Sequence, residues 1–331
     1  MKYTLVTGGL GFIGLNYIKS HILKKNIINI DSKTYAANKI NIKFSNKYIF
    51  CNFNIGNKKK IEYIFNNFKI ANIINFAAET HVDNSIARPE KIIKNNIVNF
   101  LKFLEVFKIF FLSGKIDKKI KFINVSTDEV YGSLSKTDRS FTEFSKYNPR
   151  NPYSASKASV DHICNSFCQT FGLPIITVHF SNNFGPYQHD EKFIPTIIRN
   201  VLSGDPIPIY GKGDNVRDWL YVNDTCLAID KVIKKGKIGE VYNFGGENEI
   251  SNLALVKKIC KILNKKFSNK KLLLENQITF VEDRLGHDFR YSINSNKAKK
   301  QLKWKQKSNF EKSLTKSIEW YVNKYKNLIK K

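Results

Sequence analysis

The sequence predicts an α/β protein with a doubly wound parallel sheet and a smaller lobe in its C-terminal half. Short apolar runs alternate with helical segments through the first half, and a glycine-rich turn joins the first run to the first helix. Continuous apolar runs are typical of strands that are buried on both faces, as in parallel sheets. The alternation indicates crossover helices that cover both faces of that sheet.

The strands and helices follow from local hydrophobicity and spacing. Apolar, largely β-branched runs predict strands over residues 3–7, 26–31, 71–76, 120–126 and 174–180. Helices are expected over 12–24, over an amphipathic stretch at 100–112, and in the segment that begins near Tyr153. Apolar residues at helical spacing in the lysine-rich tail predict a further packed helix, with Phe310, Leu314, Ile318 and Tyr321 on one face.

We divide the chain into two interleaved parts. Residues 1–182, with return segments near 215–245, are expected to form the sheet domain, and residues 183–331 most of a second lobe. After about residue 183 the alternation gives way to loops rich in Asn, Gly and Pro, with no internal repeat or low-complexity linker. The second lobe is expected to close over the carboxyl ends of the strands, where folds of this class bind ligands.

The formal net charge of +27 first suggests a nucleic-acid or anionic-membrane partner. The kind of basic residue argues against this, because only seven of the 55 are arginine, the residue suited to bidentate recognition of phosphate and guanine. The lysines are scattered among many Asn and Ile residues, as compositional drift would produce. We therefore expect no nucleic-acid partner, although the basic field can help to gather an anionic substrate.

Membrane and secretion signals are also missing from the sequence. The first residues lead directly into an apolar strand and not into a signal peptide. The most apolar later stretch, 100–112, is too short to span a bilayer and contains Lys102, Glu105 and Lys108. Five cysteines, an odd number without metal-binding spacing, indicate a reduced protein. We expect a cytoplasmic protein with no membrane partner and no metal site.

Glycines follow the first strand where the first helix begins. Gly8, Gly11 and Gly14 permit a tight turn, close approach of the backbone to a pyrophosphate, and packing of the helix on the strand. The pyrophosphate would rest at the positive N-terminus of that helix. Asp31 ends the second strand, where its carboxylate can accept hydrogen bonds from the adenosine ribose and would repel a 2′-phosphate. The sequence therefore predicts a Rossmann-type site for NAD, with NAD favoured over NADP.

Tyr153 and Lys157 lie four residues apart and so share one face of a predicted helix. A phenol with a pKa near 10 is a poor base at neutral pH. A neighbouring ammonium would stabilise the phenolate, and the same lysine could hydrogen-bond the nicotinamide ribose. Such a pair arises by chance in a lysine-rich chain, so its value depends on its position after the strand at 120–126.

Two acidic residues follow that strand directly. Thr127, Asp128 and Glu129 stand at its carboxyl end, where doubly wound sheets keep their chemistry. Adjacent carboxyl groups whose pKa values are driven apart can supply one acid and one base. An isolated Asp-Glu pair would more simply be a solvated acidic turn, but the neighbouring Thr127 and the Tyr153–Lys157 pair favour a catalytic role.

At these residues the chain resembles the dTDP-glucose 4,6-dehydratases, in the extended branch of the short-chain dehydrogenase/reductases. The similarity runs over nearly the whole chain. The segments that carry it are TGGLGFIG (7–14), DSKTYAAN (31–38), FAAETHVDNSI (76–86), STDEVYG (126–132), NPYSASKASVDH (151–162), SNNFGPYQ (181–188), KFIP (192–195), PIYGKGDNVRDWLYVND (208–224), YNFGGENE (242–249) and VEDRLGHDFRY (281–291).

The resemblance implies a dehydration in which NAD is reduced and then reoxidised. Tyr153, as phenolate and with Thr127 beside it, would take the C4 hydroxyl proton while NAD accepts hydride from C4. Glu129 would remove the C5 proton and Asp128 would protonate the departing C6 hydroxyl. Hydride would then return to C6, and Lys157 would complete the catalytic set.

The resemblance also implies which residues bind the ligands. The expected cofactor-binding residues are Gly8, Gly11, Phe12, Ile13, Gly14, Asp31, Lys33, Thr34, Ala77, Tyr153 and Lys157. The expected residues of the nucleotide-sugar site are Thr80, His81, Asn182, Arg217, Asn252, Arg284, His287 and Arg290. Arg284 and Arg290 are alternatives at the diphosphate, and His81 could instead shape the turn after its strand. A homodimer through helices that include 95–112 is a further implication.

The sequence departs from the family pattern at Asn54, Asn84, Phe184, Thr225 and Leu285, none of which is a proposed catalytic group. Other NAD-dependent nucleotide-sugar enzymes stay open as alternatives: a UDP-glucose 4,6-dehydratase, a 4-epimerase or a UDP-glucuronate decarboxylase. An epimerase or decarboxylase needs no Asp-Glu pair to expel the C6 hydroxyl. Sequence alone does not separate a thymidine from a uridine nucleotide.

Overall fold

A computed structural model describes residues 1–39, 47–267 and 274–328 of the chain. Its strands are β1 (Lys2–Thr7), β2 (Asn26–Asp31), β3 (Tyr48–Asn52), β4 (Lys69–Asn75), β5 (Lys121–Thr127), β6 (Ile175–Phe180), β7 (Asn182–Phe184), β8 (Ile207–Tyr210), β9 (Val216–Tyr221), β10 (Val241–Phe244), β11 (Glu249–Ser251) and β12 (Ile278–Val281).

The α-helices are α1 (Phe12–His21), α2 (Lys58–Asn67), α3 (Val82–Ala87), α4 (Pro89–Ile93), α5 (Asn99–Leu112), α6 (Pro152–Phe171), α7 (Phe193–Ser203), α8 (Val222–Lys235), α9 (Asn252–Lys266) and α10 (Phe310–Lys324). The shorter helical turns are η1 (Lys94–Val98), η2 (Asp128–Tyr131), η3 (Leu274–Gln277), η4 (Ala298–Leu302) and η5 (Lys326–Leu328).

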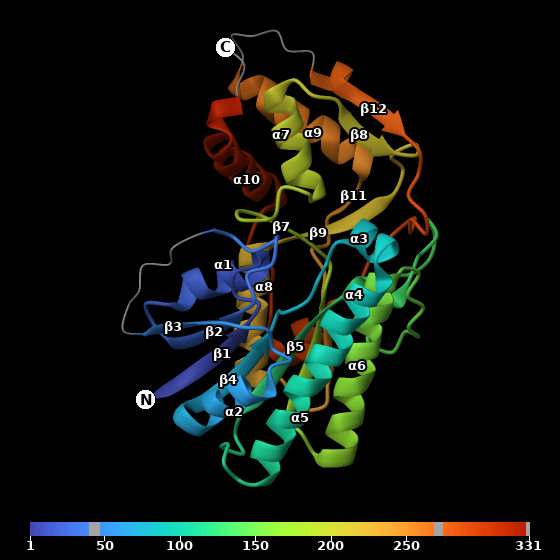
Figure 1. Cartoon of the computed structure of the whole chain (residues 1–331). Helices are drawn as coiled ribbons and strands as arrows, with labels where there is room; N and C mark the ends of the chain where they lie inside the picture. Colours follow the sequence, from blue (N-terminus) through green and yellow to red (C-terminus); the bar gives the residue numbers. More distant parts are fainter. Residues whose placement is uncertain (40–46, 268–273, 329–331) are drawn as a thin grey trace.

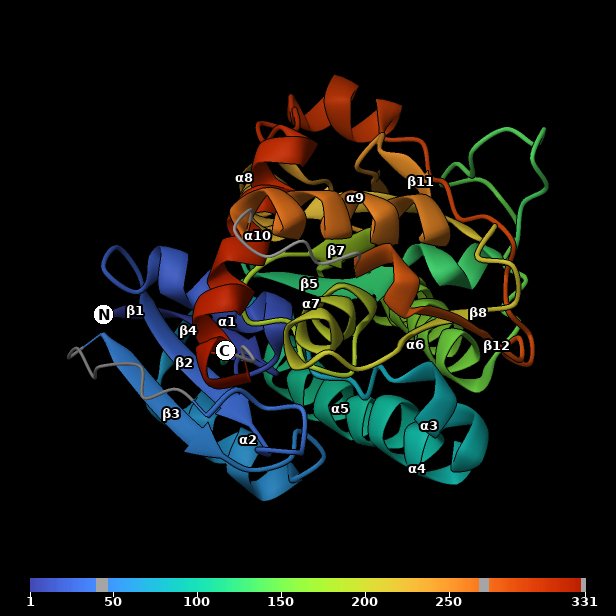
Figure 2. The ribbon, with the colours of Figure 1, turned by 90° about the horizontal axis from the view of Figure 1, so that it is seen from above.

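A seven-stranded sheet in the order β10-β6-β5-β4-β1-β2-β3 forms the larger part of the molecule, and its neighbouring strands pair in parallel. Seen from above, α5 and α8 lie on opposite sides of this sheet (Figure 2). Apolar residues of α2, α5 and α6 pack on one face and those of α1 and α8 on the other. The predicted doubly wound parallel sheet is therefore confirmed.

The second lobe lies at one end of the sheet domain (Figure 1). Its core is formed by apolar side chains of α7, α9 and α10 together with β8 and β9. Phe12 and Ile13, at the start of α1, pack against this core, so the glycine turn lies at the junction of the two parts. The predicted tail helix is confirmed, because Phe310, Leu314 and Ile318 are among its buried residues.

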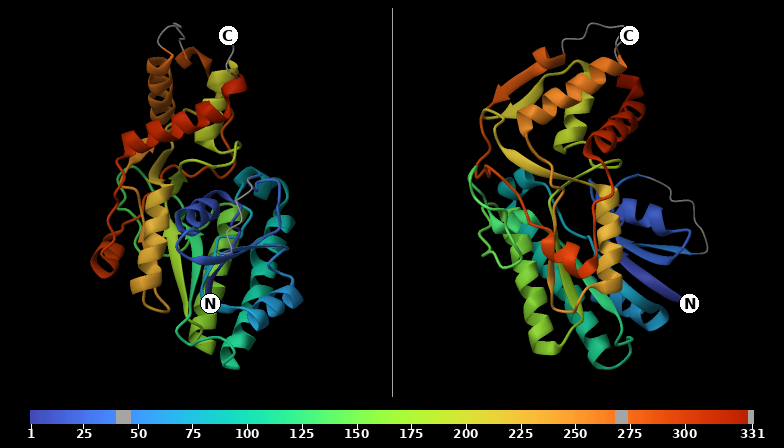
Figure 3. Two further views of the ribbon diagram at one scale, coloured as in Figure 1. Left: turned by 90° about the vertical axis from the view of Figure 1, so that its left-hand side faces the viewer. Right: turned by 180° about the vertical axis from the view of Figure 1, so that it is seen from behind.

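The five predicted strands are present, each within two residues of the expected bounds. The first helix ends at His21 instead of residue 24, because a tight turn through Lys24 and Lys25 brings the chain into β2. β3 was not predicted. α8 and β10, from the second half of the chain, lie with the sheet domain (Figure 3), while the boundary at 182 stays a prediction.

Candidate active site

The glycine turn between β1 and α1 is shaped by close backbone packing. Gly8 has φ +70°, and a Cβ atom there would lie 2.7 Å from the backbone nitrogen of Ala77. A Cβ on Gly14 would lie 2.5 Å from the carbonyl oxygen of Gly8. Gly8 and Gly14 thus serve the fold itself, as the turn and the helix packing require.

Gly11 differs from these two glycines. A Cβ atom there would meet, within 4 Å, only the carbonyl oxygen of Gly8, at 3.2 Å, and the residue lines the adjacent cavity. Gly11 is also the N-cap of α1 and provides no side-chain hydrogen bond to the first turn. The backbone N–H groups of that turn are therefore available to an anion. This surface fits the pyrophosphate of a dinucleotide.

Asp31 stands at the end of β2 on the rim of the same cavity. One carboxylate oxygen accepts a hydrogen bond from the backbone of Leu10 at 2.9 Å, and the other accepts one from the backbone of Lys33 at 2.8 Å. Burial raises the pKa of Asp31, and these two N–H donors oppose the rise. The carboxylate is held in place and leaves acceptor capacity for ribose hydroxyls.

Replacing Asp31 by asparagine is expected to weaken NAD binding about 10- to 100-fold, because hydrogen bonds to a charged acceptor contribute roughly 1.5–3 kcal/mol. The check is the NAD content of the purified protein after denaturation, together with NAD affinity by calorimetry. Asp117→Asn, an exposed change at the opposite end of the sheet domain, is the matched control. Unchanged NAD affinity in Asp31→Asn would contradict the assignment.

The cavity, of about 350 Å³, is lined by both parts of the molecule. Its lining includes ten of the expected cofactor residues, namely Gly8, Gly11, Phe12, Ile13, Gly14, Asp31, Thr34, Ala77, Tyr153 and Lys157. Lys33 is not among them, and its ammonium lies 4.9 Å from the ring centre of Phe50. Sequence reasoning missed other lining residues, among them Ser32, Ile55 and Asn95. Ile55 comes from the loop after β3, the strand that was not predicted.

Tyr153 and Lys157 project from the first turns of α6, whose start is fixed by a capping box between Asn151 and Ser154. Both side chains are buried and line the cavity, and the ammonium of Lys157 donates to the carbonyl oxygen of Val125 at 2.7 Å. Burial lowers the pKa of Lys157, as expected for a desolvated cation.

The pKa of Tyr153 departs from what the sequence predicted. Burial, followed by the nearby Glu129 and Asp128, raises it, while a hydrogen bond with Thr127 lowers it. We expected Lys157 to favour the phenolate, but in the chain alone Tyr153 is held as the neutral phenol. The carboxylates and the low-polarity surroundings outweigh the ammonium, which is directed to a carbonyl oxygen.

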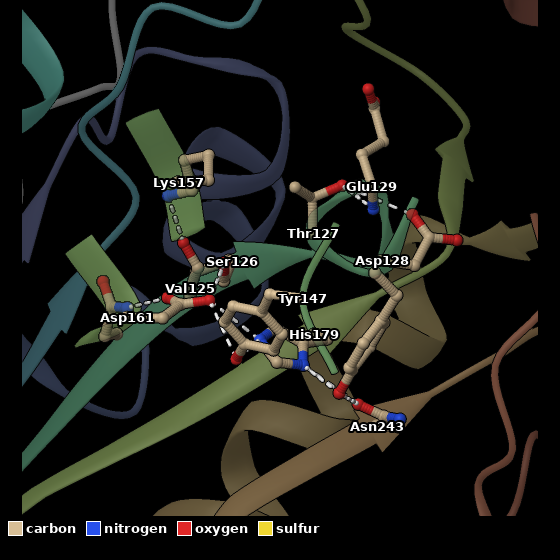
Figure 4. A network of polar contacts seen from close by, with 12 residues as sticks. Val125, Ser126, Thr127, Asp128, Glu129, Tyr147, Lys157, Asp161, His179 and Asn243 are labelled. Atoms are coloured by element: carbon tan, nitrogen blue, oxygen red, sulfur yellow. Dashed lines mark hydrogen bonds and ion pairs between the residues drawn. The ribbon is translucent and has the colours of Figure 1, made fainter. Parts of the chain in front are cut away.

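Thr127, Asp128 and Glu129 leave the end of β5 in the η2 turn (Figure 4). The hydroxyl of Thr127 accepts a hydrogen bond from the backbone of Glu129 and lies 3.3 Å from a carboxyl oxygen of Asp128. One oxygen of each acid, Oδ2 of Asp128 and Oε2 of Glu129, is buried without a hydrogen-bond partner among the described residues. Both atoms are thus available to a ligand in the cavity, which both residues line.

The two acids have different electrostatic surroundings. Burial raises the pKa of Asp128 well above its ordinary value, and the charges of Glu129 and Asp218 add to the rise. Burial also raises the pKa of Glu129, but cations at Arg284 and Arg217 oppose that rise. Asp128 is therefore suited to be the proton donor and Glu129 the ionised acceptor.

Asp128 should make the unfolding free energy fall as the pH rises. Burial raises the pKa of Asp128 in the folded chain, so protonation of this carboxyl stabilises the fold. The stabilisation is complete below the pKa of the unfolded chain, about 4, and is lost as the pH rises through the pKa of the folded chain. Asp128→Asn is expected to be more stable than the unmodified chain at neutral pH by about 1 kcal/mol. Denaturant unfolding at pH 5 and pH 8 checks this, and a stability difference that does not widen with pH would contradict it.

Several expected substrate residues lie around the acids. Thr80 and Asn182 line the cavity, and Oδ1 of Asn182 is buried without a partner among the described residues. Arg217 on β9 is buried, stacks on Tyr291 and donates to backbone carbonyls. The buried Nε of Arg284 has no hydrogen-bond partner within the described part of the chain and lies 4.0 Å from a carboxylate oxygen of Asp83. The charges of Arg284 and Arg217 both act on Glu129.

The structure separates the two arginines that were alternatives at the diphosphate. Arg290 forms a bidentate ion pair with Glu249, at 2.5 and 3.0 Å, and donates to the carbonyl oxygens of Ser135 and Asp138. These contacts fix a loop, whereas the charge of Arg284 acts on Glu129; neither arginine is in the cavity lining. The geometry favours Arg284.

Arg217 and three other expected substrate residues are likewise outside the cavity lining. His81 caps α3 by accepting a hydrogen bond from the backbone of Asn84, which agrees with its alternative role in shaping the turn. The backbone of Asn252 starts α9 and donates to Asn215. Nδ1 of His287 lies 2.6 Å from a carboxylate oxygen of Asp283. Burial lowers the pKa of His287, and the charge of Arg217 adds to this effect.

Lys192 was missed by the sequence reasoning. It lines the cavity and donates to the carbonyl oxygen of Thr80 at 2.8 Å, and its charge opposes the rise in the pKa of Glu129. Burial lowers the pKa of Lys192 itself. It lies in the segment KFIP, which carries part of the resemblance, but a lysine is an uninformative signal in so lysine-rich a chain.

The family departures fall in different surroundings. Asn54 lines the cavity, so it alone of the five is placed to affect a ligand directly. Phe184 is part of the second core, Thr225 donates to Asn183, and Asn84 donates to Tyr35. Leu285 is exposed.

Comparisons with known proteins identify relatives of this chain. A family model described as GDP-mannose 4,6 dehydratase matches residues 5–317. The dTDP-glucose 4,6-dehydratase of Salmonella typhimurium is 44% identical, covering 96% of this chain and 92% of that protein. The dTDP-glucose 4,6-dehydratase 1 of Escherichia coli is 42% identical, covering 97% of this chain and 93% of that protein.

Solved structures agree with the fold. The dTDP-glucose 4,6-dehydratase of Bacillus anthracis, in complex with NAD, superposes with a TM-score of 0.85 at 39% identity, over 99% of this chain and all of the other. A UDP-glucose 4-epimerase of Thermotoga maritima gives a TM-score of 0.84 at 25% identity, over 97% of this chain and 99% of the other. Fold similarity alone therefore does not separate dehydration from epimerisation.

Proposed function

This chain belongs to the GDP-mannose 4,6 dehydratase family, and from that premise we propose that it dehydrates dTDP-glucose to dTDP-4-keto-6-deoxyglucose. The observation that carries the proposal is the buried pair Asp128 and Glu129, placed in one cavity with Tyr153 and Lys157. A 4-epimerase leaves the C6 hydroxyl in place, and a decarboxylase acts on a C6 carboxylate, so neither needs this pair to expel a hydroxyl.

NAD, which the glycine turn and Asp31 would hold, supplies when bound a positively charged ring that accepts hydride from the sugar and returns it. Tyr153 would then lose its proton to become the base for the C4 hydroxyl, since a positive charge nearby favours the phenolate. Thr127 would orient that hydroxyl, and Lys157 would hydrogen-bond the nicotinamide ribose.

The acids act on the neighbouring carbons. Glu129, whose ionised form is favoured by the charges of Arg284 and Arg217, would remove the proton at C5, which a ketone at C4 makes acidic. Asp128, kept protonated by burial, would donate to the departing C6 hydroxyl, which leaves as water. Glu129 would afterwards return a proton to C5.

The nucleotide diphosphate would lie between the two parts of the molecule. Arg284, Arg217 and Lys192 bring cationic groups to the acid pair, and guanidinium groups match the geometry of phosphate oxygens. Asn182 offers an unused amide oxygen in the same cavity. These residues are proposed to bind the nucleotide-sugar.

We also propose a cytoplasmic homodimer. Four of the cysteines, Cys51, Cys164, Cys168 and Cys226, are free thiols, which supports a reducing compartment. The helical segment 95–112 leaves Ile109 57% exposed and Leu112 53% exposed, and these would form part of the contact. Along the described ranges, no helix has the length and apolar character needed to cross a bilayer.

The experiment that tests the function supplies dTDP-glucose to the purified protein in deuterium oxide. Loss of one water, with one deuterium entering at C5, is expected in the product by mass spectrometry and NMR. A galactose isomer of unchanged mass would favour an epimerase instead. UDP-glucose, supplied in parallel, tests the nucleotide preference, and faster turnover of UDP-glucose would favour a UDP-glucose 4,6-dehydratase.

A further inference from the structure

A buried carboxylate that the proposed reaction does not use lies directly behind the catalytic residues. Asp161 is on α6, four residues after Lys157 and eight after Tyr153, and therefore continues the same helix face. Its side chain is 3% exposed. An ionised carboxylate is rarely buried so fully unless it is paired and hydrogen-bonded.

Asp161 connects α6 to the two central strands that flank the site. One of its oxygens accepts a hydrogen bond from the hydroxyl of Ser126 at 2.8 Å and lies 2.9 Å from Nε2 of His179. Its other oxygen accepts from the amide of Asn124 at 2.9 Å. Ser126 and Asn124 belong to β5, and His179 belongs to β6.

His179 extends the network to the acid pair. Its Nδ1 lies 2.8 Å from the hydroxyl of Tyr131, which donates to the amide oxygen of Asn243 at 2.9 Å. Tyr131 is the last residue of η2, the turn that carries Asp128 and Glu129. The network therefore joins the helix that bears the redox residues to the turn that bears the dehydration residues.

Lys157 links the same two elements one residue away from this contact. Its ammonium donates to the carbonyl oxygen of Val125, which precedes Ser126 on β5. The charge of Asp161 is the first of the charges that oppose the effect of burial on the pKa of Lys157. The geometry thus gives one side chain two roles: anchoring β5 to α6, and balancing the charge of the buried ammonium.

We propose that Asp161 is a positioning residue that, with His179 and Ser126, sets the placement of Tyr153 and Lys157 relative to Asp128 and Glu129. This inference rests on the proposed function. A reaction that oxidises C4 and eliminates between C5 and C6 of one bound sugar needs both groups of residues in fixed relation. Displacements of about 1 Å can cost roughly 100-fold in rate. Outer contacts that orient reacting groups are therefore part of the catalytic design.

The test compares Asp161→Asn with Asp224→Asn. Asp224 is a matched control, because it is a fully buried carboxylate that is also hydrogen-bonded, in its case by the backbones of Lys307 and Ser308, but it lies on α8 away from the site. For Asp161→Asn we expect kcat to fall about 10- to 100-fold with KM changed less than about threefold. For Asp224→Asn, kcat should stay within about twofold of the unmodified enzyme, whatever the loss of thermal stability.

Ser126→Ala is a second and milder variant, for the case that Asp161→Asn does not fold. It removes one donor to Asp161 without adding volume, and it should lower kcat about threefold to tenfold in the same sense. Because Ser126 also lines the cavity, the NAD content of this variant is measured alongside. An unchanged kcat at full NAD content overturns the proposal.

Hydrogen exchange provides a readout that does not depend on turnover. Amides of β5 and η2 should exchange faster in Asp161→Asn, or in Ser126→Ala, than in Asp224→Asn, since the hydrogen bonds that join α6 to β5 through Asp161 are weakened. Faster exchange there supports the positioning role even if dTDP-glucose is not the substrate. Failure of the proposed function can therefore be told apart from failure of the positioning role. Equal protection of β5 and η2 in all variants, or equal kcat in Asp161→Asn and Asp224→Asn, overturns the inference.

Discussion

Replacing Tyr153 by phenylalanine is expected to lower turnover of dTDP-glucose by about 10³-fold or more while NAD stays bound. The change removes the hydroxyl that would take the C4 proton and keeps the ring, which is buried at the start of α6. Without that base the sugar is not oxidised, and every later step depends on the C4 ketone. The check is mass spectrometry of the product, combined with the near-ultraviolet absorbance of reduced cofactor after substrate is added.

Tyr242→Phe is the matched control for Tyr153→Phe. Tyr242 is a buried tyrosine on β10 whose hydroxyl contacts the backbone of Lys237 and the side chain of Gln301, away from the cavity. Its loss should leave turnover within about twofold. Turnover of Tyr153→Phe within tenfold of the unmodified enzyme would show that another group is the base at C4.

The parts of the fold with strong local signals were predictable from the sequence. Continuous apolar runs identified the central strands β1, β2, β4, β5 and β6, because strands buried on both faces contain few polar residues. In β3, at the sheet edge, only Tyr48 is buried, and the pattern of that strand is correspondingly weaker. β10 is four residues long and joins the sheet through a long-range pairing with β6, which no local pattern contains.

The site was predictable where residue type and spacing carry the chemistry. Gly11, Asp31 and Tyr153 fall in the cavity because each stands at a strand end or a helix start. Lys33 and Arg290 stay predictions as ligand contacts, and in the folded chain Phe50 and Glu249 lie against their charged groups. Such competition between partners is decided by tertiary structure and leaves no trace in a motif.

The pKa of Tyr153 illustrates the same limit. Spacing places Lys157 on the same helix face, and from that alone a lowered phenol pKa follows. Burial and the two carboxylates at Asp128 and Glu129 reverse the direction in the folded chain. The charges buried around Tyr153 are set by the fold as a whole. Helix spacing predicts only one of these neighbours, Lys157.

Asp128→Asn and Glu129→Gln are each expected to lower formation of the dehydrated product about 10²- to 10³-fold while oxidation at C4 persists. Both changes keep the size of the side chain and remove its ability to exchange a proton. Reduced cofactor should therefore accumulate after substrate is added, unlike in Tyr153→Phe. Asp138→Asn, at an exposed carboxylate on the loop after η2, is the control and should turn over normally.

The two variants should fail at different steps. Glu129→Gln removes the base at C5, so the sugar should neither lose water nor exchange its C5 hydrogen with deuterium oxide. Asp128→Asn keeps that base and loses the acid at C6, so C5 exchange should continue without loss of water. The reverse pattern would exchange the roles of the two acids, and normal turnover in both variants would remove the pair from the mechanism.

The pH dependence of kcat should separate the two acids again. Activity is expected to rise with pH as Glu129 ionises, above the usual range for a glutamate because burial raises its pKa. Activity should fall at higher pH as Asp128 loses its proton, since burial and the charge of Glu129 hold its pKa well above the ordinary value. The pair titrates as one coupled system, so the two apparent pKa values of the pH profile belong to both groups together. The residual activity of Asp128→Asn should lack the fall at high pH, and that of Glu129→Gln should lack the rise at low pH.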